Sequence, residues 1–196
     1  MKLLLASLNV HKLRELREMF KPIKGLDLYS LLDFPTYKPP EETGETFEAN
    51  AILKATDAAK HLNMLTVADD SGLVVPSIGG LPGVRSHRFA GEDPTDQENR
   101  SKLLSMLEQS FGDGRNAYFE CVIAVAKPEG LLKTVSGRVE GYISTQEKGR
   151  SGFGYDPIFI KHDYDRTFAE LDEATKNKIS HRRKAFEKLL LFLEAM

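Results

Sequence analysis

Two adjacent acids interrupt a segment that otherwise has the pattern of a buried strand. Residues 67–75 read VADDSGLVV, so Asp69, Asp70 and Ser71 stand between two apolar runs. An ionised carboxylate in a core is costly unless a partner compensates it, and strand interiors are depleted in Asp. An Asx-type turn at Asp-Ser-Gly is the structural alternative. The apolar strands on both sides favour a functional site.

Acids upstream of this segment could complete a metal site. Glu41 and Glu42 precede an expected helix, and Glu45 and Glu48 fall in its first turns, where the helix dipole is a sufficient reason for an acid. Magnesium is normally held by one or two carboxylates together with water and substrate phosphates. One Asp of the pair and one Glu of the preceding loop would meet that need. Because successive strand residues point to opposite faces, the other Asp would make a structural contact.

A third group of polar residues lies in SLNVHK, residues 7–12, where a strand gives way to a helix. A hydroxyl, an amide and a lysine at a helix N-terminus could hold a phosphate. Taken alone, the pattern favours the simpler interpretation that Asn9 caps the helix and Lys12 is solvated. Lys54 lies at the edge of the apolar face of the next helix and could reach either water or a site.

Two segments late in the chain suit an anionic ligand with a planar base. GRSGFGYDP, residues 149–157, presents Phe153 and Asp156 from a glycine-rich loop, although such loops are more often turns, and this one matches neither nucleotide-binding fingerprint. SHRRK, residues 180–184, follows Lys176. If the last helix begins near Ser180, these cations crowd its positive end and favour a bound anion. If it begins near Ala174, they form a solvated face; the pattern supports both equally.

The elements that must position these residues alternate between strand and helix. Apolar patterns predict strands at residues 2–6, 26–31, 117–127, 131–139 and 158–160, and helices at 12–20, 45–62, 94–108 and over the C-terminal apolar repeat. Asp93 and Pro94 would begin the third helix as N-cap and N1, and residues 79–91 would form a loop. The mixed order of strands and helices, together with a hairpin late in the chain, predicts an α/β fold with a mixed sheet.

Composition narrows the class of protein. With 196 residues, 41% hydrophobic and 29% charged, the chain suits one domain, or two lobes sharing a core, over residues 1–196. A formal net charge of -2 gives no field that would recruit nucleic acid or an anionic membrane. The single cysteine, Cys121, rules out an intramolecular disulfide and is expected in the core. The apolar run Leu3–Ala6 is too short for a signal peptide or a membrane span, so we expect a cytoplasmic protein.

Together these segments resemble a known family. SLNVHK, EETGETFEANAILKA, ADDSGL, GGLPGVRSHRFAGE, GFGYDPIF and SHRRKA occur in the same order as in the inosine/xanthosine triphosphate pyrophosphatase family, nearly from end to end. The resemblance implies an elongated mixed β-sheet flanked by helices, two lobes with a central substrate cleft, and a homodimer. It implies Mg²⁺-dependent hydrolysis of noncanonical purine nucleoside triphosphates (ITP, dITP and XTP) to a monophosphate and pyrophosphate.

The same resemblance implies roles for individual residues. Glu42 and Asp70 would bind Mg²⁺, and Asp70 would also accept the proton of the attacking water. The substrate-binding residues would be Ser7, Asn9, Lys12, Lys54 and Ser71, with Phe153, Gly154, Tyr155, Asp156, Lys176, His181 and Arg182 in the base pocket. One departure is Leu8, which stands where the family usually has glycine. Two alternatives remain: a pyrophosphatase for other modified nucleotides and a noncatalytic nucleotide-binding regulator.

Overall fold

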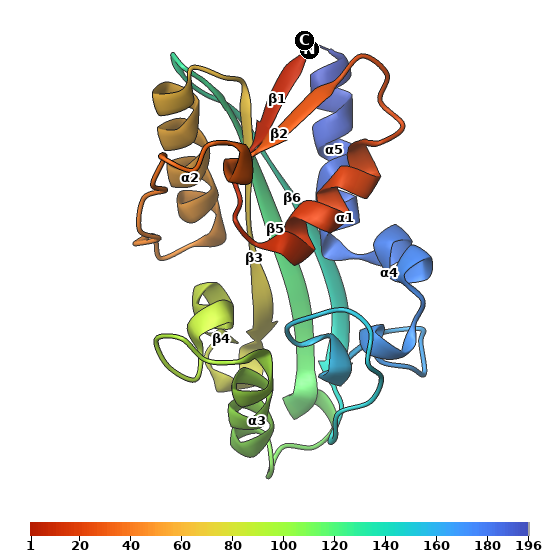
Figure 1. The fold of residues 1–196 in the computed structure, drawn as a ribbon. Coiled ribbons are helices and arrows are strands. Elements are labelled where there is room, and N and C mark those ends of the chain that lie inside the picture. Colours follow the sequence, from red (N-terminus) through yellow and green to blue (C-terminus); the bar gives the residue numbers. More distant parts are fainter. Residues whose placement is uncertain (196) are drawn as a thin grey trace. The chain divides into compact units, whose positions relative to one another are not determined.

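A mixed β-sheet organises the chain in the computed structural model, which describes residues 1–195 (Figure 1). Among these residues seven strands form one sheet in the order β2-β1-β3-β5-β6-β7, with β4 pairing with β3. The strands are β1 (Lys2–Leu5), β2 (Asp27–Ser30), β3 (Thr66–Val75), β4 (Leu81–Pro82), β5 (Asn116–Lys127), β6 (Gly130–Ile143) and β7 (Phe159–Lys161). The α/β class and mixed sheet predicted from the sequence are confirmed, since β1 is parallel to β2 and β3 whereas β6 and β7 are antiparallel.

The chain divides into two compact units, and neither is a single continuous segment. The first unit comprises residues 1–70, 121–137 and 183–195, and the second comprises residues 71–120 and 138–182. The boundaries fall inside β3, β5 and β6 and after Arg182. In β3 the boundary separates Asp70 from Ser71, so the two adjacent polar residues belong to different units. The central cleft expected from the family resemblance stays a prediction.

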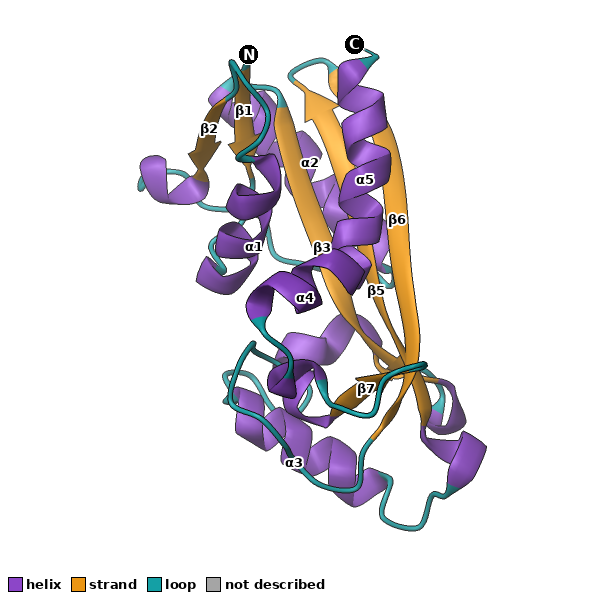
Figure 2. Ribbon diagram, turned by 90° about the vertical axis from the view of Figure 1, so that its right-hand side faces the viewer, coloured by secondary structure: helices purple, strands orange, loops and turns teal. Residues whose placement is uncertain are grey.

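In the first unit, helices cover both faces of the sheet. α1 (Val10–Phe20) and α5 (His181–Glu194) lie on one face and α2 (Phe47–Leu62) lies on the other (Figure 2). The core on the α1 side joins Leu13 and Leu16 to Leu3 of β1, Ile123 of β5 and Phe186 of α5. On the other side α2 contributes four alanines that are 0% exposed, namely Ala51, Ala55, Ala58 and Ala59. These small side chains allow the helix to pack closely.

The second unit has its own core, to which the remaining parts of the long strands contribute. α3 (Asp96–Met106) contributes Leu103, β3 contributes Leu73, and Phe119, Phe159 and Phe168 form a cluster of contacting rings. A 3₁₀ segment, η3 (Gly83–Arg88), precedes α3, and α4 (Glu173–Ile179) precedes α5. Residues 153–156 of this unit include four of the seven residues expected in the base pocket.

Two predicted helix starts were wrong, each because a local capping interaction decides where the helix begins. α3 begins at Asp96 rather than near Pro94, because Thr95 and Glu98 form a reciprocal capping box. α2 begins at Phe47, two residues later than predicted, with Thr46 as its N-cap. The segment 79–91, expected to be loop, contains β4 and η3. Both interpretations of the last helix hold in part, since α4 and α5 are separated at Ser180.

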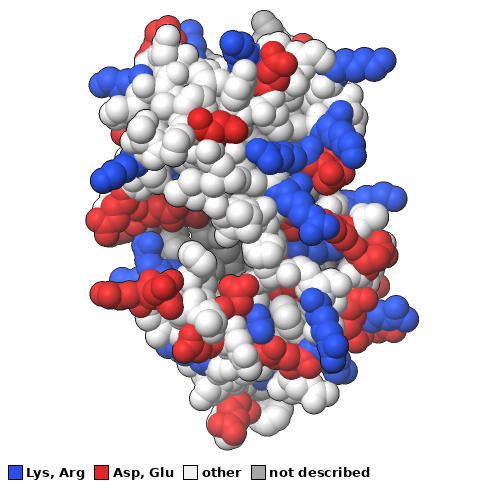
Figure 3. Space-filling model, in the orientation of Figure 1, with Lys and Arg blue, Asp and Glu red and all other residues white. Residues whose placement is uncertain are grey.

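The charged surface agrees with the near-neutral composition. Lys and Arg side chains are interspersed with Asp and Glu side chains on the face drawn in Figure 3, and no single-sign area dominates that face. Within residues 1–195, none of the helices combines the length and the apolar character that crossing a bilayer requires.

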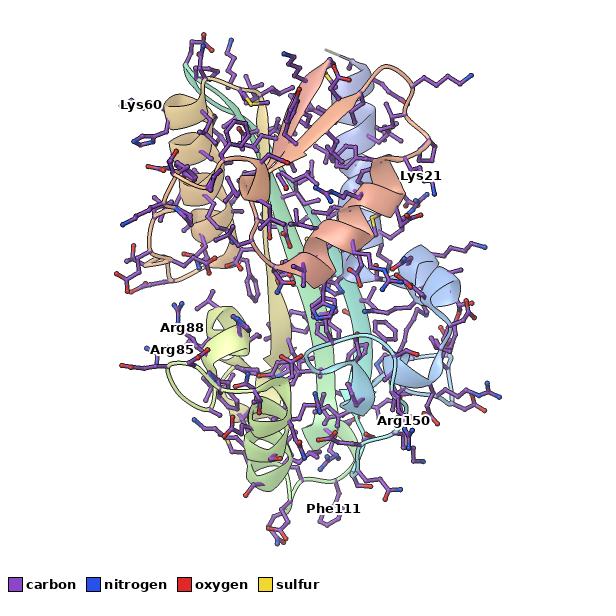
Figure 4. The ribbon with its side chains drawn as sticks, viewed as in Figure 1. Lys21, Lys60, Arg85, Arg88, Phe111 and Arg150 are labelled. Carbon is purple, nitrogen blue, oxygen red and sulfur yellow. The ribbon has the colours of Figure 1, made fainter. Side chains whose placement is uncertain are left out.

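The packing of α2 gives a first prediction. Ala55→Leu adds three carbons at a position that is 0% exposed, so we expect the free energy of unfolding to fall by about 1 to 3 kcal/mol in urea denaturation. Lys60→Gln is the control, because Lys60 is an exposed residue at the outer side of α2 (Figure 4) and should leave stability within about 0.5 kcal/mol. Equal stability of Ala55→Leu and the control would contradict close packing at this helix.

Candidate functional site

Asp70 is buried inside β3 and is held by two residues of α2. The residue is only 6% exposed, Asn50 Nδ2 donates to its Oδ2 at 3.0 Å, and Lys54 Nζ lies 3.7 Å from its Oδ1. Burial raises the pKa of the Asp70 carboxyl above its ordinary value, and the positive charges of Lys54 and Lys12 oppose that rise. The net rise means that burial outweighs the opposing positive charges at this carboxyl group.

Lys54 joins Asp70 to the loop that precedes α2. Its Nζ lies 2.7 Å from Glu42 Oε1 and 3.7 Å from Asp70 Oδ1, so one cation contacts both carboxylates. Burial by itself would lower the pKa of Lys54, but the charges of Asp70, Asp69 and Glu42 raise it above its ordinary value. The lysine therefore stays protonated, and Glu42 and Asp70 face a common point of positive charge.

Asn50 connects the same carboxylate to the Glu42 loop through its other amide atom. The side chain is 0% exposed, and its Oδ1 accepts a hydrogen bond from the Gly44 backbone N–H at 2.7 Å. A Cβ on Gly44 would lie 2.6 Å from that oxygen, which is too close for any side chain there. Asn50 thus sets both the orientation of Asp70 and the path of the chain two residues after Glu42.

Asp69 has different partners from its neighbour. It is 3% exposed, Lys12 Nζ of α1 lies 3.1 Å from its Oδ2, and Cys121 Sγ of β5 lies 4.0 Å from the same oxygen. The sequence-based interpretation of Asn9 as a helix cap is confirmed, since its Oδ1 accepts from the backbone N–H groups of His11 and Lys12. The accompanying expectation that Lys12 is solvated was wrong, because its side chain is 15% exposed and ion-paired.

A second cluster, in the second unit, surrounds the ring of Phe153. Lys176 Nζ lies 4.8 Å from the ring centroid and Arg182 Cζ lies 6.0 Å from it. Lys176 is ion-paired with Asp156, and Arg182 Nη2 donates to Ser71 Oγ at 2.8 Å. Lys176 and Arg182 are 5% and 2% exposed, which is unusual for these residue types and indicates a specific role. An aromatic face with two fixed cations can stack on a planar ring and donate to its oxygens.

Three further predicted residues are built into the frame of this cluster. Tyr155 is 3% exposed, its hydroxyl donates to the Ser86 carbonyl at 2.8 Å, and burial raises the pKa of its phenol. His181 stacks on Phe119, with ring centroids 4.8 Å apart and an angle of 11° between the planes. Gly154 has a positive φ of 59°, a conformation that favours glycine.

The predicted site residues therefore form two groups. Ser7, Asn9, Lys12, Glu42, Lys54 and Asp70 lie in the first unit, and Ser71, Phe153, Gly154, Tyr155, Asp156, Lys176, His181 and Arg182 lie in the second. Residues 1–195 hold no group of three or more His, Cys, Asp or Glu side chains arranged around one metal position. Sequence reasoning missed Asn50, although a polar residue three positions after Phe47 on an apolar helix face was a usable signal.

Comparisons with known proteins agree over the whole length. A model of the Ham1 family matches residues 3–192. The dITP/XTP pyrophosphatase of Protochlamydia amoebophila (strain UWE25) is 55% identical over 195 residues, covering 99% of this chain and 98% of that protein, and the enzyme of that name from Chlamydia caviae is 50% identical, covering 99% and 95%. The Staphylococcus aureus Ham1 protein has a TM-score of 0.88 at 41% identity, covering 100% and 99% of the two chains. A HAM1 protein from Coxiella burnetii has a TM-score of 0.90 at 40% identity, covering both chains fully. The family resemblance seen in the sequence is confirmed, and the chain belongs to the Ham1 family.

Proposed function

We propose that this chain hydrolyses the noncanonical purine nucleoside triphosphates dITP, XTP and ITP to the monophosphate and pyrophosphate, with Mg²⁺ as cofactor. The observation that carries the proposal is the buried Asp70 carboxylate, which shares the Lys54 ammonium with Glu42. Relatives named dITP/XTP pyrophosphatase at up to 55% identity support the substrate class. We also propose that the chain forms a homodimer and acts in the cytoplasm, where free nucleotides would be its substrates.

The carboxylates fit a divalent cation. Glu42 and Asp70 already face one shared positive charge, and burial raises the pKa of Asp70, so added positive charge would be favourable there. Mg²⁺ needs only one or two protein carboxylates when substrate phosphates complete its coordination. Glu42 and Asp70 would hold the ion, which when bound would polarise the phosphoryl oxygens and lower the pKa of water.

The chain's own residues account for the remaining chemistry. We expect Lys12 and Lys54 to neutralise phosphate oxygens, and Ser7 and Asn9 precede α1, whose positive dipole end favours an anion. Asp70 accepts a proton from water as the water oxygen bonds to the α-phosphorus. The bond from that phosphorus to the bridging oxygen breaks, and pyrophosphate leaves with the electron pair.

Base selection follows from hydrogen-bond polarity in the Phe153 cluster. Lys176 and Arg182 are donors, and the 6-oxo group of hypoxanthine or xanthine is an acceptor. The 6-amino group of adenine would present a donor to these donors and add no acceptor to the contacts they already make, which costs about 1 to 3 kcal/mol per mismatched contact. We therefore expect at least about tenfold discrimination against ATP for each donor that contacts the 6-oxo group but finds no acceptor on adenine.

The products formed from a nucleotide panel test this function against its alternatives. With XTP, dITP, dTTP or ATP plus Mg²⁺, we expect pyrophosphate and monophosphate from the first two, no turnover in the presence of a chelator, and recovery when Mg²⁺ is restored. Orthophosphate as the product would contradict attack at the α-phosphorus. Preferred turnover of dTTP would favour a pyrophosphatase for other nucleotides. Binding without turnover would favour a regulator.

The contacts of Asn50 give a second prediction. Asn50→Ala removes the hydrogen bond that lowers the pKa of Asp70 and frees the Gly44 loop, so kcat/KM should fall about 10- to 100-fold and its acidic limb should move to higher pH. The control is Thr56→Val, which removes a hydroxyl that bonds only to helix backbone of α2. A Mg²⁺ titration should show a higher midpoint in Asn50→Ala alone. An unchanged pH profile and midpoint would rule out this role for Asn50.

A further inference from the structure

The peptide groups of Gly154 are held on both sides by one helix. Gly154 N–H donates to Asp96 Oδ2 at 2.7 Å, and Arg100 Nη1 donates to the Gly154 carbonyl oxygen at 2.8 Å. Asp96 and Arg100 are four residues apart on α3, so they lie on the same face of that helix. We call this arrangement the α3 clamp. Hydrogen bonds to charged groups are shorter and stronger than neutral ones, so the clamp fixes the backbone at Gly154 firmly.

The clamp is itself anchored. Leu103 and Leu107 are each 0% exposed and fix α3 and the turn that follows it in the core of the second unit. The capping box formed by Thr95 and Glu98 fixes the first turn of α3, and Thr95 directly precedes Asp96. Arg100 Nη2 also pairs with Glu147 at 3.0 Å, so its guanidinium is restrained from a second direction.

The clamp acts on the segment that carries the proposed base-binding ring. Phe153 N–H donates to Asp156 Oδ2 at 2.9 Å, and Tyr155 is tied to Ser86, so the residues on each side of Gly154 are also held. Gly154 has a φ of 59°, and glycine has access to more backbone conformations than other residues. Without restraining hydrogen bonds, the backbone could therefore rotate at this position. The ring of Phe153, attached one residue earlier, therefore keeps its place beside Lys176 and Arg182.

We propose that Asp96 and Arg100 are positioning residues for base recognition, acting through Gly154 on Phe153 without touching the substrate. This inference rests on the proposed function, since it takes the Phe153 cluster as the base pocket. Preorganisation lowers the cost of binding a ligand. Loss of the clamp should thus weaken substrate binding and base discrimination more than the chemical step, because the proposed chemical step uses Asp70 and not the base pocket.

The variants Asp96→Ala and Arg100→Gln test the inference on the full chain. We expect KM for XTP to rise about tenfold in each while kcat stays within about twofold, and the ratio of kcat/KM for XTP to that for ATP to fall by a similar factor. Asp96→Asn keeps an acceptor oxygen and should recover most of the affinity that Asp96→Ala lacks. The control is Ser101→Ala, an exposed residue on α3, which should match the unaltered chain.

The outcomes separate this inference from the function on which it rests. If the unaltered chain releases no pyrophosphate from XTP, the proposed function is overturned, and the inference with it. The unaltered chain could turn over XTP normally while both clamp variants keep its KM and its ratio of kcat/KM for XTP to that for ATP. That result would overturn the inferred role of the clamp and leave the proposed function intact. Equal decreases in kcat/KM for XTP and ATP with a lowered kcat would assign Asp96 and Arg100 a merely structural role and would also overturn it.

Discussion

The free-energy cost of two carboxylates inside one strand governs the arrangement of the first unit. Asp69 and Asp70 are 3% and 6% exposed in β3, and each is compensated by a lysine from a different helix. Lys12 comes from α1 on one face of the sheet, and Lys54 comes from α2 on the other (Figure 2). The alternation of side chains along a strand thus directs the two acids to opposite faces, and we propose different tasks for them.

The proposal of unequal tasks rests on what surrounds each acid. Burial raises the pKa of the Asp70 carboxyl, and the nearby Glu42 carboxylate adds to that rise. Because Glu42 and Asp70 approach the same lysine, the two acids leave a surplus of negative charge there. Such a surplus is expected where a cation or phosphate-bound metal joins the site. Asp69 instead pairs closely with Lys12 and lies next to a buried cysteine, which is the environment of a structural contact that orients a lysine.

The second unit meets a different requirement, that of holding an aromatic ring on a glycine-rich segment. Two of the hydrogen bonds that hold the segment join the Gly154 backbone to side chains far away in the sequence, those of Asp96 and Arg100. The buried cations of the cluster are restrained in a similar way, since Lys176 and Arg182 are each fixed by a partner, Asp156 and Ser71. In the proposed function, base recognition would depend on rigid donors in the second unit. Neutralisation of the phosphate charge would depend on the lysines of the first unit.

The order of strands and helices along the chain was sufficient to predict a mixed sheet. Local patterns were sufficient for the cap at Asn9 and the apolar face of α2, because both depend on neighbours in the chain. They failed at the start of α3, where Glu98 decides between Asp93 and Thr95 by completing a capping box with Thr95 alone. Asn50 and the α3 clamp were missed because their partners are 6 to 58 residues away. The roles of the site residues came from family resemblance and stay predictions.

Side-by-side measurement of Asp69→Asn and Asp70→Asn shows most directly whether Asp70 takes part in the reaction while Asp69 supports it. For each variant, single-turnover rates with XTP and Mg²⁺ would be measured together with nucleotide affinity and thermal unfolding. We expect Asp70→Asn to keep its fold and still bind XTP but to react at least about a thousandfold more slowly. We expect Asp69→Asn to be less stable and to bind more weakly, with a much smaller decrease in rate. Near-normal turnover in Asp70→Asn, or an equal decrease in rate in a stable Asp69→Asn, would contradict this division of roles.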